Sequence, residues 1–283
     1  MTELENFCEK SLARAVPEEL RVMAKHLVKK HEGAVAVLAY GSCIRGVAAS
    51  ETLMDFYVLT ETLGQVSSNV LSRVGCALVP PNVYYAEVDG LRAKYAVLPL
   101  SLFAKWMLPT TGNPYFWARF SQPCALVFAR DSAAKAQVTS TIAQALQTSF
   151  ANAQGLTSGN NAIAIWTAGF TATYGTEFRS EKISRAAHIV ETYSDYYSQA
   201  AALMVGEKTI EANQALRRAT GKLWSALRLI KAAFTFQGGA DYIVWKIERH
   251  SGEKIELTDW QRRHPVIAGF FLLGTLLRKG AVR

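Results

Sequence analysis

The stretch LAYGSCIRGVAASETLMDFYVLTE, residues 38–61, decides the fold expected for this chain. An apolar run ends in Gly41-Ser42, and the next apolar run contains a single acid, Asp55. Glycine lacks a Cβ, so this turn lets backbone N–H groups approach a phosphate, and a helix opening over 43–49 would add its positive end. An acid inside an apolar strand is costly to bury alone, and Mg²⁺ bridging it to phosphate removes that cost. The stretch indicates either a phosphate and metal site or an ordinary turn with an incidental acid.

The surrounding runs predict a small mixed sheet in the first half of the chain. Runs with the length and composition of β-strands cover 34–40, 52–60, 82–98 and 124–130. The third run contains Asp89-Gly90, which is typical of a two-residue hairpin turn and divides the run into two antiparallel strands. A helix opened by Pro17 and another from about 132 to 149 accompany these strands. We expect the helices to pack on one side of the sheet.

The second half has helical periodicity. A stretch rich in glycine, asparagine and serine, NAQGLTSGNNA (152–162), marks the boundary. Helical patterns follow over about 160–173, 180–204 and 209–236, and in the shorter segment DYIVWKIERHSG. We therefore expect an α+β fold, with a mixed-sheet domain over 1–150, a mainly α-helical second domain over 160–260 and a C-terminal segment over 261–283.

The composition favours a folded intracellular protein with an anionic partner. Half of the 283 residues are apolar and 19% are charged, as in ordinary globular chains. The net charge is +8, and the basic surplus, mostly in the second half, suits phosphate, nucleic acid or lipid headgroups. The four cysteines lie far apart without metal-like spacing, which disfavours a zinc site or a disulfide framework. The N-terminus resembles neither a signal peptide nor a transit peptide, so we expect the mature protein to begin there.

The predicted hairpin offers further charged groups for the same site. Its turn pairs Glu87 with Arg92 and Tyr85 with Lys94, and strand alternation puts these four side chains on one face. One hypothesis is that Glu87 completes a metal site with Asp55 while Lys94 neutralises phosphate charge. The alternative is an exposed ladder of opposite charges formed by Glu87, Arg92 and Lys94.

A Gly-Ser turn followed by an acid in the next strand resembles the nucleotidyltransferase fold of polymerase-β-like enzymes. Those enzymes usually carry a second acid two residues after the first, where this chain has Tyr57. The second carboxylate must therefore come from elsewhere, and its source is open.

A narrower resemblance covers most of the chain and is strongest over residues 38–123. The chain resembles the mitochondrial translocator assembly and maintenance protein family, the soluble-type phosphatidate cytidylyltransferases. The residues that carry it are Gly41-Ser42, Asp55-Phe56, Glu87 to Tyr95, Trp106 and Tyr115 through Pro123 with Arg119, and 174–191 is a weaker match. The chain departs from the family at Gln122, where a basic residue is expected.

This resemblance implies a nucleotidyltransferase domain, Mg²⁺ as cofactor and CTP and phosphatidate as substrates. The product would be CDP-diacylglycerol, made for phospholipid biosynthesis with release of pyrophosphate. It implies that Asp55, with Glu87, binds the metal and that Gly41, Ser42 and Tyr95 contact the nucleotide. Lys94 and Arg119 would stabilise pyrophosphate or hold the lipid phosphate.

The last part of the chain favours an anionic membrane surface as partner. The run from Pro265 to Leu277 carries no charge and is flanked by basic residues. A bilayer span needs about 20 apolar residues, so this run is too short to cross. We expect it either to lie in the headgroup layer or to form a buried final helix. At 100° per residue one narrow arc of the helix near 216–236 contains Arg217, Trp224, Arg228 and Lys231. We expect this stripe either to face headgroups or to be an ordinary solvated face.

These features place the protein at the cytoplasmic side of a bacterial inner membrane, or at the matrix side of the mitochondrial inner membrane. No nucleic-acid partner is expected on this interpretation. The alternatives are a nucleotidyltransferase acting on tRNA, a protein or a small molecule, and an inactive membrane-binding scaffold. We expect structural or surface roles for His188, His250 and His264. Base selectivity, acyl-chain preference and oligomeric state are left open.

Overall fold

The structure is a computed structural model that carries side chains. It describes residues 1–45, 53–111, 113–174, 183–204, 206, 209–210, 214–235, 244, 258 and 260–261. The predicted C-terminal segment, apart from Gln261, lies outside these residues, as do His250 and His264.

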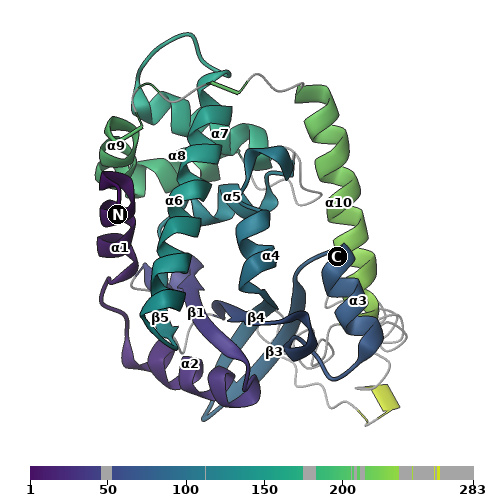
Figure 1. Cartoon of the computed structure of the whole chain (residues 1–283). Helices are drawn as coiled ribbons and strands as arrows, with labels where there is room; N and C mark the ends of the chain where they lie inside the picture. The colour runs from purple at the N-terminus through teal and green to yellow at the C-terminus, as the bar shows by residue number, and fades with distance from the viewer. Residues whose placement is uncertain are drawn as a thin grey trace, which may run out of the picture.

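The first half folds around a five-stranded mixed sheet, which confirms the predicted α+β class (Figure 1). Its strands are β1 (Ala34–Tyr40), β2 (Met54–Thr60), β3 (Asn82–Val88), β4 (Leu91–Pro99) and β5 (Ala125–Ala129). They lie in the order β3-β4-β2-β1-β5, with β2 and β4 parallel and the other neighbours antiparallel. Each strand lies within a predicted run, except that β4 extends one residue further, to Pro99.

The predicted hairpin is confirmed in turn and register. Asp89 and Gly90 both have positive φ, 50° and 75°, as a two-residue turn between right-twisted strands requires. The turn pairs Glu87 with Arg92 and Tyr85 with Lys94. Because Lys94 also pairs with Asp55 across the parallel β2–β4 contact, these side chains lie on one face of the sheet.

Helices cover both faces of the sheet, whereas the sequence predicted helices on one side only. One face is covered by α2 (Glu18–Lys30) and α3 (Val70–Leu78), and the other by α4 (Leu100–Lys105), α5 (Tyr115–Phe120) and α6 (Ser132–Gln154). The physical reason lies in β2, where Phe56 and Tyr57 point to opposite faces and both are fully buried. A strand that is apolar on both faces needs cover on both.

The end of α2 places a histidine against the sheet. His31 Nε2 lies 3.4 Å from the Tyr95 hydroxyl, and burial together with neighbouring Lys30 lowers the pKa of His31 to about 4. Between this value and the ordinary 6.5, the unfolded chain binds a proton that folded His31 does not. The free energy of unfolding therefore falls as the pH drops through that window.

We expect the free energy of unfolding at pH 4.5 to be roughly 2 kcal/mol lower than at pH 7 because of this one residue. His31→Phe keeps an aromatic ring against Tyr95 and removes the titration. The free energy of unfolding of this variant should therefore fall by about 2 kcal/mol less than that of the wild type between pH 7 and pH 4.5. Urea denaturation of both proteins at the two pH values measures the difference. Equal losses in the two proteins would show that His31 does not cause the pH dependence.

The helical half packs over the face of the sheet that carries Asp55, and its last helix also contacts the edge strand β3. It contains α7 (Ala162–Tyr174), α8 (Ile183–Thr192), α9 (Ser194–Ala202) and α10 (Gln214–Thr235). The predicted helix over 180–204 is therefore divided in two. A single buried apolar cluster runs from the sheet through α6 to these helices, including Trp166 and Phe170 of α7 and Tyr197 of α9. The N-terminal helix α1 (Glu3–Leu12) packs beside α6, so the two predicted domains share one core.

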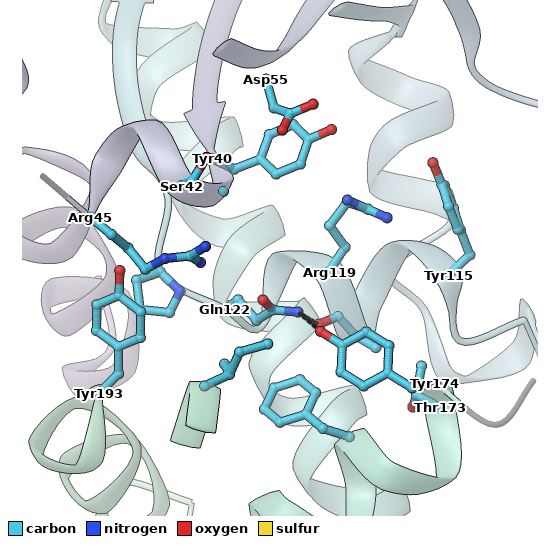
Figure 2. A pocket seen from close by; sticks show the side chains of 15 residues that line it. Tyr40, Ser42, Arg45, Asp55, Tyr115, Arg119, Gln122, Thr173, Tyr174 and Tyr193 are labelled. Atoms are coloured by element: carbon cyan, nitrogen blue, oxygen red, sulfur yellow. Dashed lines mark hydrogen bonds between the residues drawn. The ribbon is translucent and has the colours of Figure 1, made fainter. Parts of the chain in front are cut away.

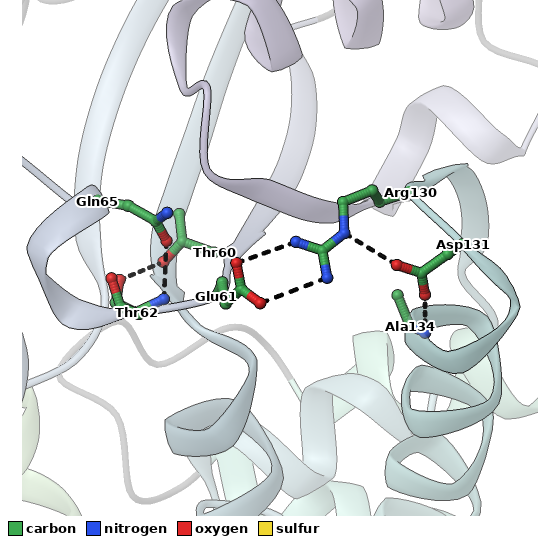
Figure 3. A network of polar contacts seen from close by, with 7 residues as sticks. All are labelled: Thr60, Glu61, Thr62, Gln65, Arg130, Asp131 and Ala134. Carbon is green, nitrogen blue, oxygen red and sulfur yellow. Dashed lines mark hydrogen bonds and ion pairs between the residues drawn. The ribbon is translucent and has the colours of Figure 1, made fainter.

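A polar network fixes the edge of the sheet where β5 leads into α6 (Figure 3). Arg130 donates to both carboxylate oxygens of Glu61, at 3.0 and 3.4 Å, and to Asp131 at 2.9 Å. Asp131 caps α6 by accepting from the Ala134 N–H at 2.7 Å. This N-cap hydrogen bond and then Arg130 lower the pKa of Asp131. The network ties the end of β2 to the start of the longest helix of the described chain.

The described helices include none long and apolar enough to cross a bilayer. All four cysteines are buried as free thiols. Burial raises the pKa of Cys8 and of Cys124 to about 12.

Candidate functional site

A cavity of about 170 Å³ lies where the end of β1, the start of β2, α5 and the helical half meet (Figure 2). Its polar and charged lining residues are Tyr40, Ser42, Arg45, Asp55, Tyr115, Arg119, Gln122, Thr173, Tyr174 and Tyr193. Gly41, Ala118, Pro123, Phe170 and Ile189 complete the described wall. The cavity therefore combines three residues predicted from the opening stretch, Gly41, Ser42 and Asp55, with Arg119.

The Gly-Ser turn touches the acid directly. Gly41 has φ +82°, and a Cβ placed on it would lie 3.1 Å from Asp55 Oδ2. Tyr40 pairs with Asp55 across β1 and β2, which explains why the turn that follows Tyr40 lies over this carboxylate. A 3₁₀ turn, η1 (Gly41–Ile44), follows Tyr40, and most of the predicted helix over 43–49 lies outside the described residues. The glycine is needed both for its φ and for the space.

Two guanidinium groups lie on opposite sides of the cavity (Figure 2). Arg45 follows η1, and Arg119 comes from α5. The Arg119 guanidinium lies 5.3 Å from the Tyr40 ring centroid and 5.0 Å from that of Tyr115. Such cation–π contacts hold the side chain in one orientation. Among the described lining residues Asp55 is the one acid, so two cations face one carboxylate, as an anionic ligand would require.

Tyr57 does not supply a polar group to the cavity. It is fully buried, and its ring packs edge-on against Phe120, 4.8 Å between centroids. Its hydroxyl donates to the Tyr115 hydroxyl at 3.3 Å. The position of the missing second acid is thus filled by an aromatic core residue. Within the described ranges no three His, Cys, Asp or Glu side chains converge as metal ligands.

Tyr115 sits among cations. Burial raises its pKa, but Arg119 and Arg228, with smaller contributions from Tyr57 and Lys94, outweigh burial and lower the pKa overall. Arg228 of α10 lies 3.7 Å from the centre of the Tyr115 ring. For Tyr40 the balance is opposite, because burial and then Asp55 raise its pKa well above the usual range. Tyr115 therefore lies nearer to the cations, and Tyr40 nearer to the carboxylate of Asp55.

Aromatic side chains of the helical half line the other end of the cavity. Gln122 donates to the Tyr174 hydroxyl at 3.2 Å, which fixes the amide toward the cavity wall. Phe170 and Tyr174 come from α7, and Tyr193 lies between α8 and α9. This end offers ring faces and one amide, with Arg45 beside Tyr193 (Figure 2), and the opposite end offers Asp55 and Arg119.

The structure does not bring the other predicted site residues into this cavity. Lys94 lies on the face of Asp55 and does not line the cavity, although it is close enough to Tyr115 to help lower its pKa. Tyr95 follows Lys94, so alternation turns it to the opposite face, where it stacks on Tyr84 with centroids 5.4 Å apart. Tyr95 therefore does not line this cavity.

Glu87 is also separated from Asp55. It lies on the edge strand β3 with β4 between them, and its carboxylate is 3.2 Å from Arg92 and accepts from the Tyr85 hydroxyl at 3.0 Å. The exposed charge ladder was the alternative interpretation of this hairpin, and these contacts fit it. A shared metal site would require Glu87 to leave both partners.

The basic and aromatic stripe of α10 faces the protein, which corrects the prediction that it faces headgroups or solvent. Arg217 donates to Asn152 Oδ1 and lies 5.7 Å from the Trp117 ring centre. Trp224 packs edge-on against Trp106 at 5.1 Å. Lys231 donates to the backbone carbonyl oxygens of Val79 and Pro81 and to Asn82 Oδ1. Each member, Arg228 included, contacts the body of the protein, and burial lowers the pKa of Lys231 to about 8.

Sequence reasoning missed several residues of the cavity. Arg45 lies only three residues after Ser42, so a search for cations beside the turn would have found it. Tyr174 and Tyr193 reach the cavity through tertiary packing; Tyr174 begins the weaker family match over 174–191, and no local pattern marks Tyr193. His188 is exposed, in keeping with the surface role predicted for it.

The comparisons with known proteins add little to this picture. No protein-family model and no curated protein matches the chain. Among solved structures the chain is similar to the crystal structure of a nucleotidyltransferase-like protein from Exiguobacterium sibiricum, with 12% identity, 92% of each chain covered and a TM-score of 0.29. So slight a likeness carries no functional argument. Membership of the cytidylyltransferase family therefore stays a prediction, and the residues of the cavity must carry the functional conclusion.

Proposed function

We propose that the protein is a nucleotidyltransferase that transfers CMP from CTP to phosphatidate, forming CDP-diacylglycerol and pyrophosphate. The observation that carries the proposal is the contact between the positive-φ turn at Gly41 and the Asp55 carboxylate, inside a cavity that also holds Arg45 and Arg119. A turn without a Cβ beside one acid and two cations suits a phosphorylated ligand that brings a divalent cation. The choice of CTP and phosphatidate rests on the sequence resemblance.

The cavity offers one protein carboxylate as a ligand for Mg²⁺. Magnesium is commonly bound through one or two carboxylates, with substrate phosphates and water completing its shell. Asp55 would be the protein carboxylate, and the Ser42 hydroxyl lies in the same cavity. When bound, the ion would withdraw charge from the phosphates of the nucleotide. A site with one protein carboxylate depends on the nucleotide for the remaining ligands, so metal and nucleotide should bind together.

The chain's own residues would position the reactants. A phosphate oxygen of phosphatidate forms a bond to the α-phosphorus of CTP, the bond to the β-phosphate oxygen breaks, and its electron pair leaves with pyrophosphate. A phosphate monoester is mostly ionised at neutral pH, so the cavity needs no strong general base. Arg45 and Arg119 would hold the charged oxygens in line, and such positioning and charge neutralisation carry the rate.

The two ends of the cavity suggest which end holds which part of the nucleotide. The triphosphate would lie at Gly41, Ser42 and Arg119, where the charges are. The base would lie toward Tyr174 and Tyr193, whose rings can stack on it, with Gln122 available for hydrogen bonds to its edge. Gln122 stands where a positively charged residue is expected. This side chain would therefore contact the nucleobase and not a phosphate.

Incubation with each of the four α-labelled nucleoside triphosphates, with and without phosphatidate vesicles and Mg²⁺, tests the proposal. We expect label from CTP to enter the organic phase only when lipid and Mg²⁺ are both present. Label that enters tRNA or protein in the absence of lipid would show a nucleotidyltransferase with another acceptor. Absence of both CTP binding and transfer would show a protein without this activity.

A further inference from the structure

Two neighbouring helices leave an apolar face uncovered among the described residues. On α3 the exposed side chains are Val70, Leu71, Val74 and Leu78, and on α10 they are Leu216, Leu223, Leu227 and Ile230. Leu71 and Leu78 are 80% and 66% exposed, and Leu223 and Ile230 are each 59% exposed. Soluble proteins rarely leave so many large apolar side chains together in water, and such a patch usually marks an interaction site. We call these eight residues the α3/α10 face.

The two helices lie side by side (Figure 1). A Cβ placed on Gly75 of α3 would lie 3.3 Å from Lys231 Cδ of α10, and Lys231 bonds the carbonyls that follow α3. At 100° per residue the four apolar residues of α10 fall within an arc of about 60°. This arc lies next to Lys231, and so it borders α3. The exposed side chains of α3 therefore adjoin the end of this strip near Ile230, and the strip continues along α10 to Leu216.

The charges that the two helices themselves contribute to this surface have one sign. Neither α3 nor α10 contains an acidic residue. Arg73 lies on the flank of α3 away from Gly75, since two residues correspond to 200° of rotation. Lys222 is exposed on the flank of α10 opposite Lys231. The apolar strip is thus bordered by basic residues on both sides, which is the pattern of a surface that enters the headgroup layer of an anionic bilayer.

We propose that the α3/α10 face docks the protein on an anionic lipid bilayer. This docking surface differs from the stripe predicted on the same helix, because that stripe is used to attach α10 to the body of the protein. The helix then has two roles: Leu223, Leu227 and Ile230 contact lipid, and Arg228 on its inner side contacts Tyr115 of the cavity. The inference rests on the proposed function only in that a bilayer substrate gives such docking a purpose.

The test is flotation of the full-length protein with vesicles of phosphatidylcholine alone and with one third phosphatidylglycerol. We expect binding to the anionic vesicles only. The double variant Leu71→Ser, Leu227→Ser should lower the partition coefficient at least about tenfold, since each leucine loses buried apolar area. Lys222→Gln should lower it about fivefold, because one basic residue near an anionic surface contributes about 1 kcal/mol.

Matched controls separate the face from general effects. Leu108→Ser removes an exposed leucine elsewhere, and Lys25→Gln removes an exposed lysine of α2; both should bind as the wild type does. Thermal melts check that all variants fold. Unchanged vesicle binding in the leucine variant would overturn the proposal. A concentration-dependent dimer that this variant abolishes, with vesicle binding intact, would show that a second copy covers the face.

A second readout keeps this inference apart from the proposed function. If both hold, the leucine variant loses CTP turnover on vesicles and keeps it on water-soluble short-chain phosphatidate. If only the docking holds, no protein turns over CTP, yet the leucine variant still loses vesicle binding. If only the activity holds, the variant matches the wild type on both substrates.

Discussion

Asp55→Asn is expected to lower CTP turnover at least about a thousandfold, which corresponds to about 4 kcal/mol of transition-state stabilisation. Asparagine has nearly the same shape, so the contact with Gly41 persists, while the negative charge that would hold the divalent cation is gone. Turnover of labelled CTP with phosphatidate vesicles measures the effect. Binding of CTP in the presence of Mg²⁺ should weaken in parallel, because metal and nucleotide are expected to bind together.

Glu87→Gln is the matched acid variant. Glu87 is paired with Arg92 and Tyr85 on the edge strand, so its turnover should stay within about threefold of the wild type, as expected for an exposed ion pair. A loss as large as that of Asp55→Asn would show that Glu87 joins the metal site and that the hairpin rearranges when ligand binds. Full activity of Asp55→Asn would refute the assignment of Asp55.

Gly41→Ala is expected to lower turnover about a hundredfold, because displacement of a reacting group by even 1 Å can cost this much. The new Cβ would meet Asp55 Oδ2 at 3.1 Å, and alanine at φ +82° is itself strained. The free energy of unfolding should fall by about 1–2 kcal/mol from the φ cost alone. Steady-state kinetics and urea denaturation measure the two effects separately.

Gly90→Ala is the control for backbone strain. Gly90 also has positive φ, +75°, but a Cβ there would meet nothing within 4 Å, and the residue lies in the β3–β4 turn. Its stability should fall by a similar amount, about 1–2 kcal/mol, with turnover unchanged. Equal losses of turnover in Gly41→Ala and Gly90→Ala would show that reduced stability, and not displacement of Asp55, lowers activity.

The parts of the fold that were predictable are those fixed by local chemistry. Asp89-Gly90 allows few turns, and that turn then dictates the register of Glu87 with Arg92 and of Tyr85 with Lys94. The turn at Gly41 and the acid at Asp55 were likewise visible as a pair, because a glycine that ends one apolar run and an acid inside the next are both exceptional in a sequence.

Other features depended on which side of an element faces the protein. Lys94 and Tyr95 cannot point to the same face of one strand, so alternation excluded Tyr95 from a site on the face of Lys94. The stripe of α10 has a moderately polar composition that suits solvent as well as carbonyl groups and rings, and only tertiary packing assigns it to Asn152, Trp106 and Tyr115. Tyr174 and Tyr193 reach the cavity by the same long-range packing.

The most direct test of the central claim is a crystal structure with Mg²⁺ and a non-hydrolysable CTP analogue. We predict the triphosphate at the Gly41-Ser42 turn, with the metal ion bound to Asp55 and the phosphates and with Arg119 contacting phosphate oxygens. Nucleotide bound elsewhere, or Asp55 without metal while the nucleotide is present, would contradict the account.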